Sequence, residues 1–310
     1  MDRPGDADPT PEWAFELCEG AAHWTDIDVD HSGVDGEPYG EHQTVAVTTT
    51  AWASAGWSIS LTPITTQTSR AETRTEWSFG IPIATGIAGR KRDGLVLPVQ
   101  LDSWPIDLVR SKIEQDANFL LRKHGLRRPE SNVVPSTLLT AIRCQVGKLL
   151  QRGSGDSVVR YRIGGHLIAS GDALMVSEFE PYGPYFRPPG GGAVRRLPPA
   201  RRVIAQGAWV VVSSDVWLEL MQAVGDLAAE LKRPFHPAVV MVPLLPTTPP
   251  KNELVVDIGT AQPGLPNGGH CRFNLIRTRS IERVSRHLGH LDKRYLDEIA
   301  TGLELVLGLE

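Results

Sequence analysis

Clusters of arginine and lysine are the residues in this sequence best suited to chemistry, because such cations can hold phosphate groups. They are Arg90, Lys91 and Arg92, then Arg195, Arg196, Arg201 and Arg202, and then a basic stretch from Arg277 to Arg286. Binding through these side chains would weaken as salt rises, because each phosphate contact releases counterions. Solvated loop charge explains the same clusters, so a local nucleic-acid site and a plain polar surface both remain open.

Tryptophan side chains could complement such a site by stacking on unpaired bases. Trp52, Trp57, Trp77 and Trp209 lie in or beside segments that are rich in apolar residues. Stacking on tryptophan is a common way to hold single-stranded RNA. Core packing is the alternative explanation for all four residues.

Three other patterns resemble ion or phosphate sites, and each lacks a required residue. The acidic run at 26–37 has His31 where an EF-hand loop needs glycine. His287 and His290 have no third metal ligand nearby in the sequence. The glycine-rich loop at 188–192 lacks the Gly-Lys-Ser/Thr of a phosphate-binding loop. We therefore expect neither a metal ion nor a cofactor.

Composition places the chain among ordinary globular proteins. It has 310 residues, 41% of them hydrophobic and 22% charged, with a formal net charge of −4. This balance excludes a wholly disordered chain and gives no overall field for nucleic acid. Cys18, Cys144 and Cys271 are too far apart for a zinc motif or a disulfide framework. Without a leader-like or membrane-spanning apolar run, we expect a cytoplasmic protein with no membrane partner.

Short strands followed by a helical region are predicted in the first part of the chain. Strands are predicted at 44–50, 57–62, 79–87 and 94–101. A helix is predicted from Ser103 to Gly125, because Ser103 can cap it, Pro105 suits its first turn, and apolar residues follow at helical spacing. A second helix is predicted from Pro135 to Gly153.

The same order of elements recurs in the second part. Strands are predicted at 165–176, 209–213, 238–244, 254–258 and 271–276. A helix is predicted from Asp215 to Lys232, and an amphipathic helix from Leu291 closes the chain at Gly308. Two β-rich domains are therefore expected.

The domain boundaries follow from these elements and from composition. A flexible acidic arm is expected at 1–16, an N-terminal domain at 17–152, a linker at 153–165 and a C-terminal domain at 166–310. The repeated order suggests an old internal duplication.

The C-terminal stretch at 275–284 (LIRTRSIERV), with the following HLGHL and a helix ending VLGL, resembles the tail of MazF/PemK-type toxins. Upstream segments fall in that family's order. Residues 171–181 are similar to its first strand, 210–215 to its second and 242–247 to its third. This is the more specific of two matches within the chain.

The first half resembles the same family through other segments. Residues 61–67 (LTPITTQ) are similar to its Pro-x-Thr-Thr-Gln segment. Residues 91–104 are similar to the strand that follows, and residues 19–28 to strand one. The resemblance implies an α+β fold of two SH3-like (MazF/PemK/CcdB-type) β-barrels, each with closing helices, arranged as a pseudo-dimer.

The resemblance also implies an activity. Toxins of this family are metal-independent endoribonucleases that act on single-stranded RNA, generally as homodimers, and a separate antitoxin protein neutralises them. In their reaction the RNA 2′-hydroxyl attacks the adjacent phosphate, which requires a proton acceptor, a proton donor and a nearby cation. The family supplies these with an Arg leading into strand two and a Thr or Ser ending strand three.

Matching positions assigns these roles to residues of this chain. Thr65 falls on the family's Thr, and His42 falls where the family has Arg. A histidine can carry a proton near neutral pH, so His42 could replace the arginine chemically. In the second half the two positions fall on Gly207 and Leu245, which supply neither charge nor proton. Catalytic chemistry is therefore expected only in the first half.

The RNA-binding residues expected from this assignment are Arg90, Lys91, Arg92, Arg201, Arg202 and Arg277. The alternative is a catalytically inactive MazF-like module that binds nucleic acid or a partner protein in the same groove. A third interpretation is an unrelated β-rich scaffold. The chain is expected to be either a monomeric pseudo-dimer or a homodimer.

Overall fold

The computed structural model describes most of the chain between its two ends. The described residues are 19–26, 41–54, 58–66, 79–90, 92–106, 109, 133–150, 159–179, 203–233, 235–246, 255–259 and 268–309. The predicted acidic arm at 1–16 and the acidic run at 27–37 lie outside these residues.

Strands outnumber helices in the first half, here residues 19–150. Its elements are β1 (Ala22–Asp26), β2 (Glu41–Ala46), α1 (Thr50–Ser54), β3 (Ser58–Thr65), β4 (Ile81–Ile83), η5 (Ile87–Gly89), β5 (Gly94–Val96), η6 (Pro98–Gln100), β6 (Asp102–Pro105) and α3 (Ser136–Leu150). β3 is buried along its whole length, as its run of apolar, Ser and Thr residues permits.

The second half, residues 159–309, begins with a hairpin and then repeats this order. Its elements are β7 (Tyr161–Ile163), β8 (His166–Ile168), β9 (Asp172–Phe179), β10 (Val203–Val211), α4 (Asp215–Glu230), β11 (Ala238–Leu245), β12 (Val256–Ile258), β13 (Gly269–Cys271), η7 (Phe273–Leu275), β14 (Arg277–Ser280), η8 (Ile281–Arg283), β15 (Val284–His290) and α5 (Lys293–Leu307). The β7–β8 hairpin starts inside the predicted linker: β7 was not predicted, and β8 lies within the strand predicted at 165–176.

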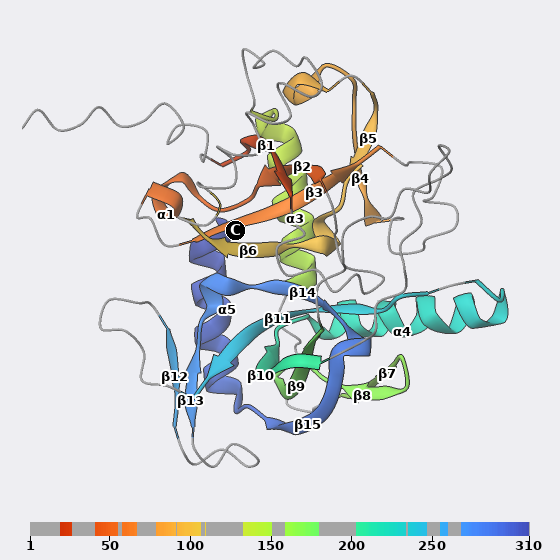
Figure 1. Cartoon of the computed structure of the whole chain (residues 1–310), viewed down its shortest axis with the longest axis vertical. Coiled ribbons are helices and arrows are strands. Elements are labelled where there is room, and N and C mark those ends of the chain that lie inside the picture. Colours follow the sequence, from red (N-terminus) through yellow and green to blue (C-terminus); the bar gives the residue numbers. More distant parts are fainter. Residues whose placement is uncertain are drawn as a thin grey trace, which may run out of the picture.

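The fold is α+β, as predicted, and its main feature is one antiparallel sheet that runs through both halves (Figure 1). This 13-stranded sheet has the central order β1-β2-β3-β6-β14-β11-β10-β9-β15, with β4, β5, β12 and β13 attached at its sides. The described strands form no closed barrel, because β1 and β15 remain at the two ends of this path. No described helix is both long and apolar enough to cross a bilayer.

Strand pairing follows the same scheme in the two halves. In the first half β3 pairs with β2, β5 and β6, and in the second half β11 pairs with β10, β13 and β14. The registers therefore match individual positions, so that Thr65 corresponds to Leu245 and Val96 to Cys271. Matched side chains also make matched bonds: Thr48 Oγ1 accepts from Ser60 N at 2.6 Å, and the corresponding Ser213 Oγ accepts from Val240 N at 2.8 Å.

Two matched glycines carry out the same structural task. A Cβ on Gly94 would lie 2.5 Å from the Thr65 carbonyl oxygen, and one on Gly269 would lie 2.7 Å from the Leu245 carbonyl oxygen. No side chain fits at such distances from a backbone atom, so both strand pairs can close only on glycine.

The two halves join where β6 pairs with β14 (Figure 1, centre). Asp102 lies opposite Arg277 in this pair, and these two residues occupy matched positions in their halves, opposite Leu61 and Met241. Arg277 Nε lies 3.2 Å from Asp102 Oδ1, and the Arg277 guanidinium stacks 4.3 Å from the centre of the Trp104 ring. Opposite charges thus meet where a symmetric pair of chains would bring one residue against itself.

The long helices α3 and α5 tie each half to the other (Figure 1). Ser214 N donates to the carbonyl of Leu149 in α3 at 2.7 Å, and the corresponding Thr49 N donates to the carbonyl of Val306 in α5 at 3.0 Å. These carbonyls belong to the last turns of the helices, where no partner exists within the helix. Each helix end is therefore completed by the opposite half.

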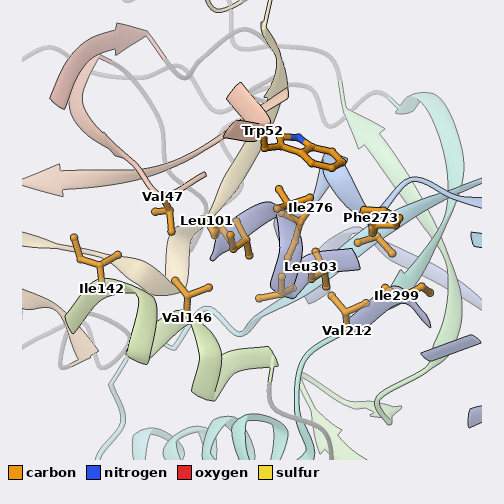
Figure 2. Close-up of a cluster of buried hydrophobic side chains, with 14 of the residues drawn as sticks. Val47, Trp52, Leu101, Ile142, Val146, Val212, Phe273, Ile276, Ile299 and Leu303 are labelled. Atoms are coloured by element: carbon orange, nitrogen blue, oxygen red, sulfur yellow. The ribbon is translucent and has the colours of Figure 1, made fainter. Parts of the chain in front are cut away.

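One core cluster is shared by the two halves (Figure 2). It combines Val47, Trp52, Leu101, Ile142 and Val146 of the first half with Val212, Phe273, Ile276, Ile299 and Leu303 of the second. The Trp52 and Phe273 rings lie 6.3 Å apart, within the range of favourable aromatic pairing. The halves are therefore joined by packing as well as by strand pairing.

The helix predicted to begin at Ser103 is wrong at its start. Residues 102–105 form β6, in which Ser103 pairs with Ser60 and Trp104 with Ile59. The cap-like Ser103 is fully buried, and its hydroxyl instead lies 2.7 Å from that of Ser60. The helices predicted from Pro135, from Asp215 and to Gly308 are confirmed as α3, α4 and α5.

Candidate functional site

The predicted catalytic pair lies where β2 begins and β3 ends. Gln43 of β2 pairs with Ile64 of β3, and the next residues outward on the two strands are His42 and Thr65. Continued by one residue, the antiparallel register sets His42 opposite Thr65, and directly opposite side chains share one face of a sheet. Thr65 is buried, while the side chain of His42 lies outside the described part of the structure.

A buried polar group supports this end of the sheet. Arg90 is only 8% exposed, and its Nη1 donates to Gln43 Oε1 at 3.0 Å. Gln43 Nε2 in turn donates to the Ala88 carbonyl at 2.8 Å, and Arg90 Nε donates to the Arg92 carbonyl at 3.3 Å. Burial lowers the pKa of Arg90, and the nearby Asp93 opposes that shift. The Arg90 guanidinium is thus engaged in internal contacts immediately beside the His42–Thr65 strand pair.

Asp93 closes the loop between β4 and β5. Its Oδ1 accepts hydrogen bonds from Thr85 N at 2.7 Å and from Thr85 Oγ1 at 2.8 Å. These bonds from Thr85 are the main cause of a lowered pKa at Asp93, so the exposed carboxylate stays ionised. This arrangement fixes the loop that carries Arg90 and Arg92.

The structure distributes the predicted RNA-binding residues unevenly. Arg92 is exposed beside Asp93, whereas Arg90 is buried and Arg277 is paired with Asp102 in the seam between the halves. Lys91, Arg201 and Arg202 lie outside the described residues. Arg92 is the described member of the set whose side chain is open to solvent.

The matched position in the second half has lost this polar character. The registers set Ala208 where the first half has Gln43, and Leu245 where it has Thr65. Gly207, which matches His42, precedes Ala208 on β10. These residues offer no acid, base or cation, so acid–base chemistry of the predicted kind has no residues to carry it there.

The second half holds a different polar cluster, which sequence interpretation missed. Asp172 is fully buried, and its Oδ1 lies 3.1 Å from His287 Nε2, 3.1 Å from His290 Nδ1 and 3.2 Å from Arg160 Nη2. Its Oδ2 accepts from Ala169 N at 2.9 Å. Burial alone would raise the pKa of Asp172, but the bonds from His290, His287 and Ala169 outweigh it and lower that pKa.

The sequence contained part of the signal for this cluster. His287 and His290 were considered only as metal ligands, and the structure instead directs one nitrogen of each ring to the same carboxylate oxygen. No group of three or more His, Cys, Asp or Glu side chains in the described ranges is arranged to hold a metal ion.

Comparison with known proteins gives matches among solved structures. No protein-family model and no curated protein matches the sequence. A mycobacterial endoribonuclease in complex with its cognate antitoxin is 18% identical, covering 45% of this chain and 94% of that chain, with a TM-score of 0.28. The MazE–MazF complex of Deinococcus radiodurans is 15% identical, covering 44% and 96%, with a TM-score of 0.28.

A second mycobacterial endoribonuclease is 22% identical and covers 33% of this chain and 81% of that chain, with a TM-score of 0.24. Two of the matched structures are thus endoribonucleases, and the third is a MazE–MazF complex. Each match spans less than half of this chain and most of the matched chain.

Proposed function

We propose that this chain is a MazF-like toxin-type protein that cleaves single-stranded RNA without a metal ion, through His42 and Thr65 of the first half. The observation that supports the proposal is the pairing of β2 with β3, the two strands that contain these residues. His42 would accept the proton of the attacking 2′-hydroxyl and pass a proton to the leaving 5′-oxygen as its bond to phosphorus breaks. The Thr65 hydroxyl would hydrogen-bond the phosphate during this displacement.

The proposed architecture is a tandem pair of MazF-like, SH3-like units at 17–152 and 166–310, joined by residues 153–165 and packed as a pseudo-dimer. The repeated pairing scheme and the matched glycines Gly94 and Gly269 support it. The first unit would carry the chemistry, and the second would complete the RNA-binding surface. Its site of action would be the cytoplasm, and a separate antitoxin protein would be its inhibitor.

The proposed RNA contacts fall into two groups. Arg92, Lys91, Arg201 and Arg202 would meet the RNA backbone directly, which makes binding sensitive to salt. Arg90 would act indirectly, because its bonds to Gln43 and to the Arg92 carbonyl hold this end of the sheet. Arg277 would act through the seam that joins the halves.

Purified protein tests the proposal directly. We expect the wild type to cleave unstructured RNA in excess chelator, leaving 2′,3′-cyclic phosphate ends, and Thr65→Ala to lose about 100-fold of this rate. The adjacent, exposed Thr66→Ala is the matched control and should cleave normally. His42→Arg should also lower the rate, because a permanently protonated guanidinium cannot accept the proton of the 2′-hydroxyl.

The alternative function is a catalytically inactive module that binds RNA or a partner protein in the same groove. The loss of polar residues at Ala208 and Leu245 favours this alternative for the second half. RNA binding without cleavage by well-folded wild type, unaltered by Thr65→Ala and by His42→Arg, would establish it and exclude the enzyme. Induction of wild type and Thr65→Ala in a host, with growth and bulk RNA followed, repeats the test in cells.

A further inference from the structure

A pocket of about 400 Å³ lies in the second half and is lined by residues of the β7–β8 hairpin, β9 and β15. Arg160, Arg162, His166 and His287 supply its polar lining, and Leu174 and Val284 supply part of its apolar lining. No carboxylate is among the lining residues in the described part of the chain. The volume suits a small ligand, and the basic lining suits an anion.

The buried carboxylate of Asp172 holds two of the side chains that line this pocket. It accepts from Arg160 Nη2 and from His287 Nε2, the two residues that connect the cluster to the pocket. Because an ionised carboxylate only accepts hydrogen bonds, His287 donates through Nε2 and presents its other face and Nδ1 away from Asp172. When the His287 ring is protonated, Nδ1 also carries a hydrogen, which a phosphate oxygen can accept.

The first half shows that the fold does not require these charges. In the first half, the Gly20 amide donates to the Ala46 carbonyl, and the Val134 amide donates to the Gly20 carbonyl. In the second half, the Gly171 amide donates to the Val211 carbonyl, and the Leu291 amide donates to the Gly171 carbonyl. This match sets Ala21 and Val133 at the positions of Asp172 and His290.

The Ala21–Val133 pair and the Asp172–His290 pair lie at equivalent places in the two halves. The first pair has apolar side chains, and the second contains a buried ionised carboxylate. Burial of a carboxylate costs free energy that an alanine–valine pair does not. A charged cluster at a place where apolar residues suffice is therefore better explained by what it binds than by what it stabilises.

We propose that this pocket binds a terminal phosphate monoester on a nucleotide-sized ligand. The Arg160 and Arg162 guanidinium groups and His287 would hold the phosphate, and the apolar wall at Leu174 and Val284 would pack against the sugar or base. Asp172 is a positioning residue that fixes His287 and Arg160. The phosphate can come from a free mononucleotide or from the 5′ end of an RNA, and the two sources share this chemistry.

Calorimetric titration of the full chain tests the site. Uridine 5′-monophosphate should bind and uridine should not, and a 5′-phosphorylated trinucleotide compared with its 5′-hydroxyl form separates the two sources. Arg162→Gln should weaken binding about tenfold, which is the usual effect of losing one charge-assisted bond. The matched control is Arg286→Gln, which removes an exposed arginine of β15 that does not line the pocket.

The role of Asp172 needs a readout that a structural residue would not change. In Asp172→Asn, the ¹⁵N shifts of His287 should report changed ring protonation while the protein stays folded, with a melting temperature lowered by several degrees. Affinity should drop about tenfold. The double variant Asp172→Ala with His290→Val copies the first half, so it should fold and not bind.

Three results would overturn the proposal. They are equal binding of nucleotide and nucleoside, no binding of either, and equal weakening by Arg162→Gln and Arg286→Gln, which would indicate general charge attraction alone. Failure here is separable from failure of the proposed ribonuclease, because Thr65→Ala should bind the nucleotide as the wild type does.

Discussion

The two halves share one pairing scheme but carry their polar side chains in different places. In the first half they lie at the end of β3, where Thr65, Gln43 and Arg90 gather, and in the second half the corresponding strand ends in Leu245. At the start of β9 the second half buries Asp172, where the first half has Ala21. The framework therefore holds with or without charge at either place, and the polar groups mark where the two halves differ in chemistry.

The largest effect is expected at the feature that the halves share. Gly94→Val and Gly269→Val should each destabilise the protein by about 3 kcal/mol or more, because each new side chain meets a carbonyl oxygen closer than any contact allows. Gly147→Ala in α3 is the control, and its Cβ meets no atom within 4 Å. It should stabilise by about 0.5–1 kcal/mol in denaturant unfolding. Tolerance of valine at one glycine alone would break the match between halves.

The next largest effect is expected at Glu178 and its two arginines in the second half. Trp104 of the first half matches Arg279 of the second, and Arg279 shares Glu178 with the fully buried Arg283 at 3.0 and 3.3 Å. Glu178→Ala should cost about 3 kcal/mol, because it leaves two arginines without their carboxylate. Glu230→Ala on the exposed end of α4 should change stability by less than about 0.5 kcal/mol. Equal small losses in urea unfolding would contradict the internal role of this cluster.

The seam between the halves allows a swap experiment. Asp102→Arg sets two arginines together at the partly buried β6–β14 pair, and Arg277→Asp sets two aspartates together. Each should cost about 1–2 kcal/mol, and the double variant should recover at least half of the summed loss. A double-mutant cycle on unfolding free energies measures this coupling. Additive losses would show that the opposite charges contribute nothing to joining the halves.

Lowering the pH should destabilise the second half, because Asp172 becomes protonated. The pKa of this carboxylate is lowered in the folded state, so its contribution is complete above the unfolded value near 3.8 and is lost as pH falls through the folded value. Asp172→Asn should therefore be less stable than wild type by about 1–2 kcal/mol at pH 7. The difference should shrink below about pH 4.

The unfolding free energies of wild type and Asp172→Asn, measured from pH 3 to 7, check this expectation. Taking their difference removes the contribution of Asp215, which lies near His290. Ala21→Gly at the matched place is the control, because it changes stability by a similar amount without any dependence on pH. A constant difference between wild type and Asp172→Asn would contradict the ionised state.

The smallest effect concerns two uncharged residues at matched positions. Cys271 matches Val96, and burial raises the pKa of its thiol to about 12. Alkylation of the folded protein should label the exposed Cys144 and spare Cys271, as peptide mass spectrometry would show. Cys271→Val should cost less than about 1 kcal/mol. Rapid labelling of Cys271 would mean that this part of the core opens readily.

Local periodicity predicted the helices and the long strands well. α3, α4 and α5 repeat apolar residues at helical spacing, and β11 is a buried apolar run. The segment at Ser103 was predicted as a helix start because a serine followed by tryptophan and proline suits the start of a helix as well as it suits a strand. What makes it a strand is its pairing with β3 and with the distant β14, and a local pattern carries no information on such partners.

The sites were predictable to different degrees. Thr65 and His42 were predicted because their segments resemble known ones. The pairing of β2 with β3 places these residues on neighbouring strands, and their catalytic role stays a prediction. The Asp172 cluster was not found, because its histidines lie on β15, which pairs with β9 across more than a hundred residues of chain. Burial of Arg90 was also missed, because a run of three basic residues suggests an open loop.

The seam between β6 and β14 has a consequence for how this molecule behaves in a cell. Both strands belong to one polypeptide, so they face each other at an effective concentration of about millimolar or more, whatever the amount of protein present. Dilution therefore cannot separate the two strands, and the pairing of β6 with β14 should persist at any protein concentration.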